Sequence, residues 1–160
     1  MRYYFFDSST FLKLFVVEAG ATRVREIVRG AQGDGTRVRV SFCDIAHPEC
    51  VSALRQLIER GEGGRRGISL ASLRRTLPEL AAIASHGSMF TIIRASNVIS
   101  EAAELAFRHR VKGADAVHIA AAQHVHRHAA EGDEFWFVSA DQRQVAAARQ
   151  EGMLVLDPTT

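Results

Sequence analysis

Hydrophobic residues in this chain fall into short runs that alternate with longer stretches of mixed polarity. The short runs are rich in aromatic and β-branched residues, which predicts strands at 3–6, 36–42, 89–93, 135–139 and 153–156. The longer stretches have helical patterns, over 9–17, 21–30, 48–60, 70–84, 99–109, 114–127 and 142–150. Alternation of this kind indicates an α/β fold, with a mostly parallel sheet and helices on both faces.

The composition fits a single globular domain over residues 1–160, with 47% hydrophobic residues. No apolar run approaches the roughly 20 residues that cross a bilayer, and the N-terminus lacks a signal-peptide pattern, so we expect a cytoplasmic protein with no membrane contact. Cys43 and Cys50 form no CxxC pair, which is compatible with a reducing compartment. Pro48 suits a first helical turn, whereas Pro78 is expected to kink or divide its helix.

The net charge is only +2, but nearly all of the basic residues are arginine; Lys13 and Lys112 are the exceptions. Arginine fits phosphate through a bidentate fork, although its abundance can also reflect genomic base composition. Two interpretations stay open for the densest group, a solvated surface or a patch for nucleic acid or an acidic partner. This group surrounds the turn GEGGRRG and comprises Arg55, Arg60, Arg65, Arg66, Arg74 and Arg75.

Four acids occupy positions where an α/β fold places its functional sites. Asp7 follows the first strand and Asp141 follows the fourth, so both are expected at the carboxyl edge of the sheet. Glu49 and Asp115 begin apolar helical segments. Each acid alone could be a helix cap or a partner of the helix dipole. Together they would repel one another, and a divalent cation with oxygen ligands, Mg²⁺ or Mn²⁺, would offset that repulsion.

Four stretches in order also resemble the PIN-domain ribonucleases, and among these the VapC-type toxins of prokaryotic toxin-antitoxin pairs. FFDSSTFLKLFVVEAG is similar to the opening strand and turn of that family, with Lys13 and Glu18 at their usual places. PECVSALRQL resembles the segment with the family's glutamate, although Pro48 directly before Glu49 departs from the usual motif. KGADAVHIAAA resembles the third motif, and FVSADQRQVAAARQEGMLVLDP the closing strand, helix and strand.

The resemblance implies a three-layer α/β/α sandwich and an endoribonuclease that requires Mg²⁺ or Mn²⁺. Asp7 and Asp115 would be the principal metal ligands, with Glu49 and Asp141 completing the catalytic site. The hydroxyls of Ser9 and Ser139 would hold a carboxylate in place. The implied partners are an RNA substrate, a small antitoxin that neutralises the toxin, and a second copy of the chain in a homodimer.

Three other groups of residues have a structural explanation that we prefer. His118 lies three residues after Asp115 on one helix face, and we expect it to support the site, because hard cations prefer oxygen ligands. His124 and His128, in HVHRH, have the spacing of a zinc pair without an evident third ligand. The hydroxyls at 8–10 lack the G-x-S-x-G context of a nucleophile and suit helix capping instead.

Other functional classes fit less well. A phosphatase of the haloacid dehalogenase type needs a second acid two residues after the first, where this chain has Ser9. A phosphoacceptor receiver domain needs paired acids after its first strand and a lysine after a late strand, where this chain has Asp141. A PIN fold that processes RNA outside a toxin-antitoxin pair, or binds RNA without cutting it, stays open.

Overall fold

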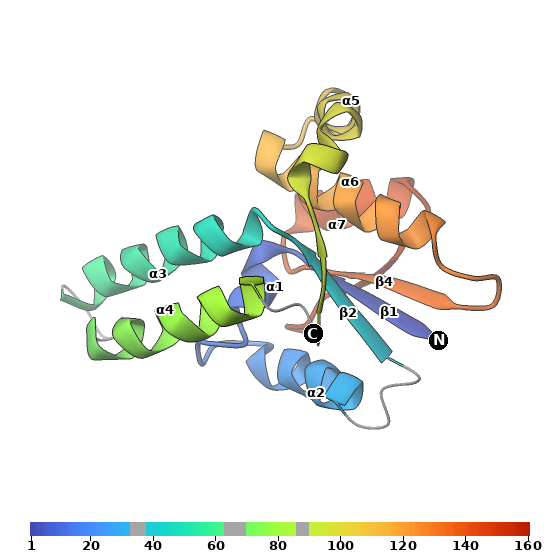
Figure 1. The fold of residues 1–160 in the computed structure, drawn as a ribbon. Helices are drawn as coiled ribbons and strands as arrows, with labels where there is room; N and C mark the ends of the chain where they lie inside the picture. The colour runs from blue at the N-terminus through green and yellow to red at the C-terminus, as the bar shows by residue number, and fades with distance from the viewer. Residues whose placement is uncertain (33–37, 63–69, 86–89) are drawn as a thin grey trace.

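The computed structural model describes residues 1–32, 38–62, 70–85 and 90–160 (Figure 1). Its five strands form one sheet in which every pairing is parallel, in the order β3-β2-β1-β4-β5. In chain order the strands are β1 (Arg2–Phe6), β2 (Val38–Cys43), β3 (Phe90–Ile93), β4 (Glu134–Val138) and β5 (Leu154–Leu156). The expected α/β class and parallel sheet are therefore confirmed.

Helices cover both faces of this sheet and complete a three-layer α/β/α sandwich. One face carries α1 (Ser8–Leu12), α2 (Ala21–Gln32), α3 (Ala46–Glu62) and α4 (Leu70–Ser85). The other carries α5 (Ile99–His109), α6 (Gly113–Arg127) and α7 (Gln142–Gln150). A short 3-10 helix, η1 (Ala95–Asn97), which the sequence pattern did not predict, connects β3 to α5. Figure 1 shows α3 and α4 as a pair of helices that extends beyond the edge of the sheet.

Alternation of side chains along the strands separates the core into two clusters. Phe5 packs with α5, α6 and α7, whereas the next residue, Phe6, packs with the helices of the opposite face. The same alternation divides Cys43 from Phe42 on β2. Successive side chains of a strand point to opposite faces, so buried runs of this kind identify strands that are covered on both sides.

The end of the first helix and the start of the third differ from those expected. The first helix ends at Leu12 instead of residue 17, and the chain continues through turns at residues 13–15. There the buried Lys13 ammonium lies 2.6 Å from the Glu18 carboxylate. Residues five apart lie about 140° apart around an α-helix, so a helix continued to residue 17 would not bring this pair together. On the third helix Pro48 lies in the first turn, as expected, but the helix already begins at Ala46.

The fourth helix is not divided at its proline. Pro78 lies within α4, which runs as one helix from Leu70 to Ser85. Residues 63–67 of the glycine-rich turn GEGGRRG lie outside the described ranges. No helix in the described part of the chain is long and apolar enough to span a membrane.

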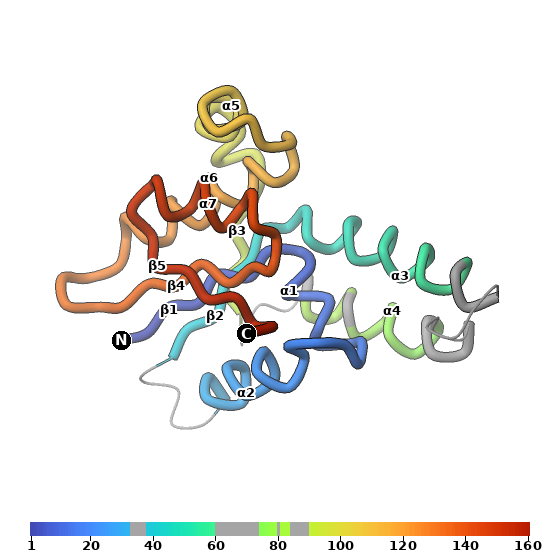
Figure 2. The backbone as a smooth tube through the Cα atoms, turned by 180° about the vertical axis from the view of Figure 1, so that it is seen from behind, coloured from blue at the N-terminus to red at the C-terminus, as the bar shows by residue number. Residues whose placement is uncertain are grey.

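The position of β1 at the centre of the sheet determines what lies near its carboxyl end. It pairs with β2 on one side and β4 on the other, and Phe6 is in register with both Phe42 and Val138. In Figure 2 the N-terminal strand runs between these two neighbours. Asp7 and Ser139, the next residues of β1 and β4, therefore leave the sheet at the same edge.

Candidate functional site: an acidic cluster at the carboxyl edge of the sheet

Asp7 is the buried centre of the cluster, with an exposed fraction of 0%. It is the N-cap of α1, and its carboxylate accepts a hydrogen bond from the Thr10 backbone N–H at 2.7 Å. Ser9 Oγ lies 3.0 Å from both carboxylate oxygens, and Ser139 Oγ donates at 2.8 Å. Both hydroxyls thus contact the Asp7 carboxylate directly. The expected cap at Asp7 is present, and it holds the carboxylate in one orientation.

Ser139 joins Asp7 to the next acid along the edge. Its hydroxyl oxygen donates to Asp7 and accepts from the backbone N–H of Asp141 at 3.0 Å. The Asp141 carboxylate accepts from the backbone N–H groups of Arg143 and Gln144, so Asp141 is the N-cap of α7. The start of α7 is therefore tied to the end of β1 through one hydroxyl.

Gln144 joins Asp141 to Asp115, and the sequence interpretation gave it no part in the site. Its side chain is 4% exposed, and its Nε2 donates to Asp115 Oδ1 at 3.1 Å, while its backbone N–H donates to Asp141. The amide oxygen Oε1 is buried and has no hydrogen-bond partner in the described part of the chain. Its position three residues after Asp141 fits a capping box, but its contact with a residue on α6 depends on how α6 and α7 pack.

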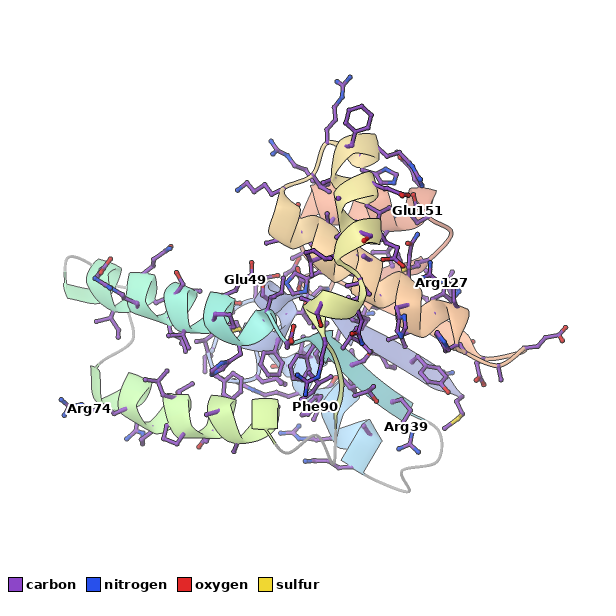
Figure 3. All side chains as sticks on the ribbon, turned by 45° about the horizontal axis from the view of Figure 1, so that its top comes forward. Arg39, Glu49, Arg74, Phe90, Arg127 and Glu151 are labelled. Carbon is purple, nitrogen blue, oxygen red and sulfur yellow. The ribbon has the colours of Figure 1, made fainter. Side chains whose placement is uncertain are left out.

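Glu49 reaches the cluster from α3, on the opposite face of the sheet. Its Oε2 lies 2.7 Å from Nε2 of His118, which is 1% exposed on α6. Figure 3 shows Glu49 where the first turns of α3 approach α6. His118 Nδ1 is buried and has no partner among the described residues. His118 therefore contacts an acid of the cluster directly.

The pKa values show that the acids share one electrostatic environment. Burial raises the pKa of Asp115 most, and the charge of Asp141 raises it further; His118 and Lys112 lower it in part, and the charge of Glu49 adds a smaller increase. Burial also acts to raise the pKa of Glu49, but hydrogen bonds from His118 and Ser8 and the charge on His118 together lower it below its ordinary value. Of Asp115 and Glu49, Asp115 is therefore the acid whose ionised form is disfavoured by its surroundings.

The two cysteines offer no reactive thiol. Both are free and buried, and burial raises the pKa of each thiol to about 12, so neither is a thiolate near neutral pH. The charges of Glu49 and Asp7 also raise the pKa of Cys50, which places that thiol beside both acids. Cys50 lies under the cluster as part of its apolar support.

The structure brings all four predicted acids to one edge of the sheet, but not into a preformed metal site. Within the described ranges, no three His, Cys, Asp or Glu side chains form a group that could hold an ion as they lie. The rings of His124 and His128 are tilted relative to each other, with centroids 4.6 Å apart, at the far end of α6 and away from the acids. Of the arginine group, Arg55 pairs with Glu59 on the exposed surface of α3, and Arg65 and Arg66 fall outside the described residues.

Comparison with known proteins supports the fold. Neither the models of protein families nor the curated protein sequences contain a match to this chain. Among solved structures, a chain described as "Toxin-antitoxin complex from Klebsiella pneumoniae" aligns with a TM-score of 0.55 and 17% sequence identity. The alignment covers 96% of this chain and 96% of that chain. At this identity the similarity concerns the three-layer fold over its full length.

Proposed function

We propose that this protein is a PIN-type endoribonuclease that requires Mg²⁺ or Mn²⁺, and that it is the toxin of a toxin-antitoxin pair. The observation that carries the proposal is the hydrogen-bonded series Asp7, Ser139, Asp141, Gln144 and Asp115 at the carboxyl edge of a parallel sheet. It gathers carboxylates where α/β enzymes bind ligands. The four motifs resemble those of this family, and the solved neighbour comes from a toxin-antitoxin complex.

The chemistry of the cluster suits a hard divalent cation. Its four acids offer oxygen ligands alone, which Mg²⁺ and Mn²⁺ prefer. The raised pKa of Asp115 reflects burial first and then repulsion by Asp141, and a positive ion would relieve that repulsion. Asp7 and Asp115 would hold the ion, with Glu49 and Asp141 completing its surroundings. When bound, the cation supplies positive charge for the phosphate and a water of lowered pKa.

The residues of the chain have separate tasks in this proposal. Ser9 and Ser139 orient the Asp7 carboxylate, and the amide of Gln144 orients that of Asp115. His118 holds Glu49 by a hydrogen bond and is a positioning residue, since its Nε2 is occupied by that contact. The apolar remainder of α6, buried from Ala116 to Ala122, fixes the helix against the sheet so that Asp115 keeps its place.

The activity is tested by incubating purified protein with structured RNA in the presence of EDTA, Mg²⁺ or Mn²⁺. We expect cleavage only with the metal, and its loss in Asp7→Asn, Asp115→Asn and Glu49→Gln. The matched control is Glu59→Gln, which removes an exposed carboxylate from the same helix as Glu49 and should leave cleavage unchanged. Cleavage in EDTA, or full activity of both Asp variants, would contradict the proposal.

The toxin role needs a test in cells. Expression of the chain alone should arrest growth, and co-expression of a small neighbouring gene should restore it. Asp115→Asn should not arrest growth at the same protein level. Active enzyme that no neighbouring gene neutralises would instead favour an RNA-processing nuclease, and RNA binding without cleavage would favour a binding protein. Sedimentation of the purified chain tests the homodimer expected from the resemblance.

A further inference from the structure

A second polar site lies at the opposite end of the sheet from the acidic cluster. It is a cavity of about 230 Å³ between α6 and strands β1, β2 and β3. In Figure 3 Arg39 marks this end of the sheet and Glu49 the other. The six polar side chains that line the cavity are Tyr3, Arg39, Ser41, Thr91, His124 and His128.

The register of the strands explains why polar groups gather there. On the face toward α6, the carboxyl half of the sheet presents the paired residues Cys43 and Ile93, which belong to the apolar core. Toward the amino ends the same face changes character, with Arg39 opposite Tyr3 and Ser41 opposite Thr91. This polar part of β2 and β3, with Tyr3 of β1, lines the cavity beside the last turns of α6.

The lining of the cavity is suited to an anion. None of its eight residues is acidic, and Arg39 has no hydrogen-bond or ion-pair partner among the described residues. Thr91 is exposed and its hydroxyl is a free donor within the described ranges, whereas His128 Nδ1 lies 2.6 Å from the His124 backbone oxygen. The guanidinium of arginine matches the oxygens of a phosphate with two parallel hydrogen bonds.

We propose that this cavity binds a phosphate group of the RNA strand whose cleavage we assign to the acidic cluster. The inference rests on the proposed function. Asp115 and His124 lie nine residues apart on α6, about 13 Å along its axis, so the two sites would contact different phosphates of one strand. Arg39, Thr91 and His128 are all exposed. A site as exposed as this one suits a phosphate within a strand that lies across the surface, whereas sites for small free ligands enclose most of the ligand surface.

The test compares the affinity of the full chain for short single-stranded RNA by fluorescence anisotropy at several salt concentrations. All proteins carry Asp115→Asn so that the RNA stays intact. Arg39→Gln is expected to weaken binding about tenfold at low salt. It should also reduce the slope of log K against log salt by about 0.7, the effect of one lost phosphate contact on a single strand. Arg39→Lys should keep the slope and recover part of the affinity.

Arg149→Gln is the matched control, because Arg149 is exposed on α7 and does not line the cavity. An unchanged affinity and slope in Arg39→Gln, or equal losses in the two variants, would refute the phosphate site while RNA cleavage by the wild type still supported the nuclease. Inorganic phosphate should shift the ring NMR signals of His124, and Arg39→Gln should abolish the shift. Such a shift without any RNA affinity would overturn the RNA contact and indicate a site for a free anion.

Discussion

Replacement of Gln144 separates the role of its amide in the site from its role in stability. The side chain makes one favourable contact, the hydrogen bond from Nε2 to the Asp115 carboxylate at 3.1 Å. It also has one unfavourable feature, the buried Oε1 without a partner in the described structure. Rotating the amide would place Oε1 against the carboxylate, so the unfavourable atom cannot be relieved in that way.

These opposing contributions are similar in size. A hydrogen bond to a charged group stabilises a protein by about 1.5 to 3 kcal/mol, and an unsatisfied buried polar atom costs about 1 to 3 kcal/mol. Gln144→Leu removes both and keeps the side-chain volume, so its free energy of unfolding should stay within about 1.5 kcal/mol of wild type. Gln144→Glu places a second carboxylate beside Asp115 and should lose about 3 kcal/mol or more near neutral pH.

Urea denaturation in EDTA measures the two stabilities, and single-turnover cleavage of RNA measures the function. Gln144→Leu should be nearly as stable as wild type but cleave at least tenfold more slowly, because Asp115 loses the group that orients it. A stable Gln144→Leu protein with wild-type cleavage would refute the positioning role. A loss of several kcal/mol in that variant would refute the balance of contributions.

Three further predictions concern stability. Asp115→Asn should raise the free energy of unfolding of the metal-free protein near neutral pH. Burial and neighbouring acids raise the pKa of Asp115, so the wild type loses stability as the pH rises above about 4. Urea midpoints measured across pH should show this fall in the wild type alone. For Glu49 the pKa is lowered, so its effect on stability has the opposite pH dependence: the stabilisation that His118 gives it is present above about pH 4.3 and lost below. The stability difference between wild type and His118→Ala should therefore shrink on acidification. A constant difference would contradict this. Gly20→Ala should lower the thermal midpoint more than Gly152→Ala. Both glycines have φ near +80°, which costs alanine about 1 to 2 kcal/mol, but of the two only Gly20 would place the new Cβ 2.7 Å from a backbone oxygen of the C-terminal tail. Equal losses would show that the tail moves aside.

The sequence pattern predicts the sheet more accurately than the connections between its elements. Strands buried on both faces are near-continuous apolar runs, so β1 and β4 are recognisable from sequence alone. The end of α1 at Leu12 is different, because it coincides with the ion pair between Lys13 and Glu18, a contact outside the helical repeat. The 3-10 turn η1 begins where the Ala95 N–H donates to Asp44, which lies 51 residues away in the chain.

The same distinction applies to the candidate site. Asp7 and Asp141 are predictable because parallel strands carry their carboxyl ends to one edge. The bond between His118 and Glu49 joins helices from opposite faces of the sheet, and that between Gln144 and Asp115 depends on the packing of α6 against α7. Neither distance can be obtained from local periodicity, which predicts only which face of a single helix or strand is buried. The cavity beside Arg39 likewise depends on the register of three strands.

The central position of β1 has a consequence for synthesis of the chain. Domains generally begin to fold from the N-terminus while translation continues. Here β1 can pair with β2 once β2 has been made, but its other edge has no partner until β4, which starts at Glu134, has been made. Asp141 and the hydroxyl of Ser139 that fixes Asp7 also come from this late segment. An emerging chain therefore cannot assemble the cluster that we propose cuts RNA, and a ribosome translating it is not exposed to a finished nuclease until the chain is nearly complete.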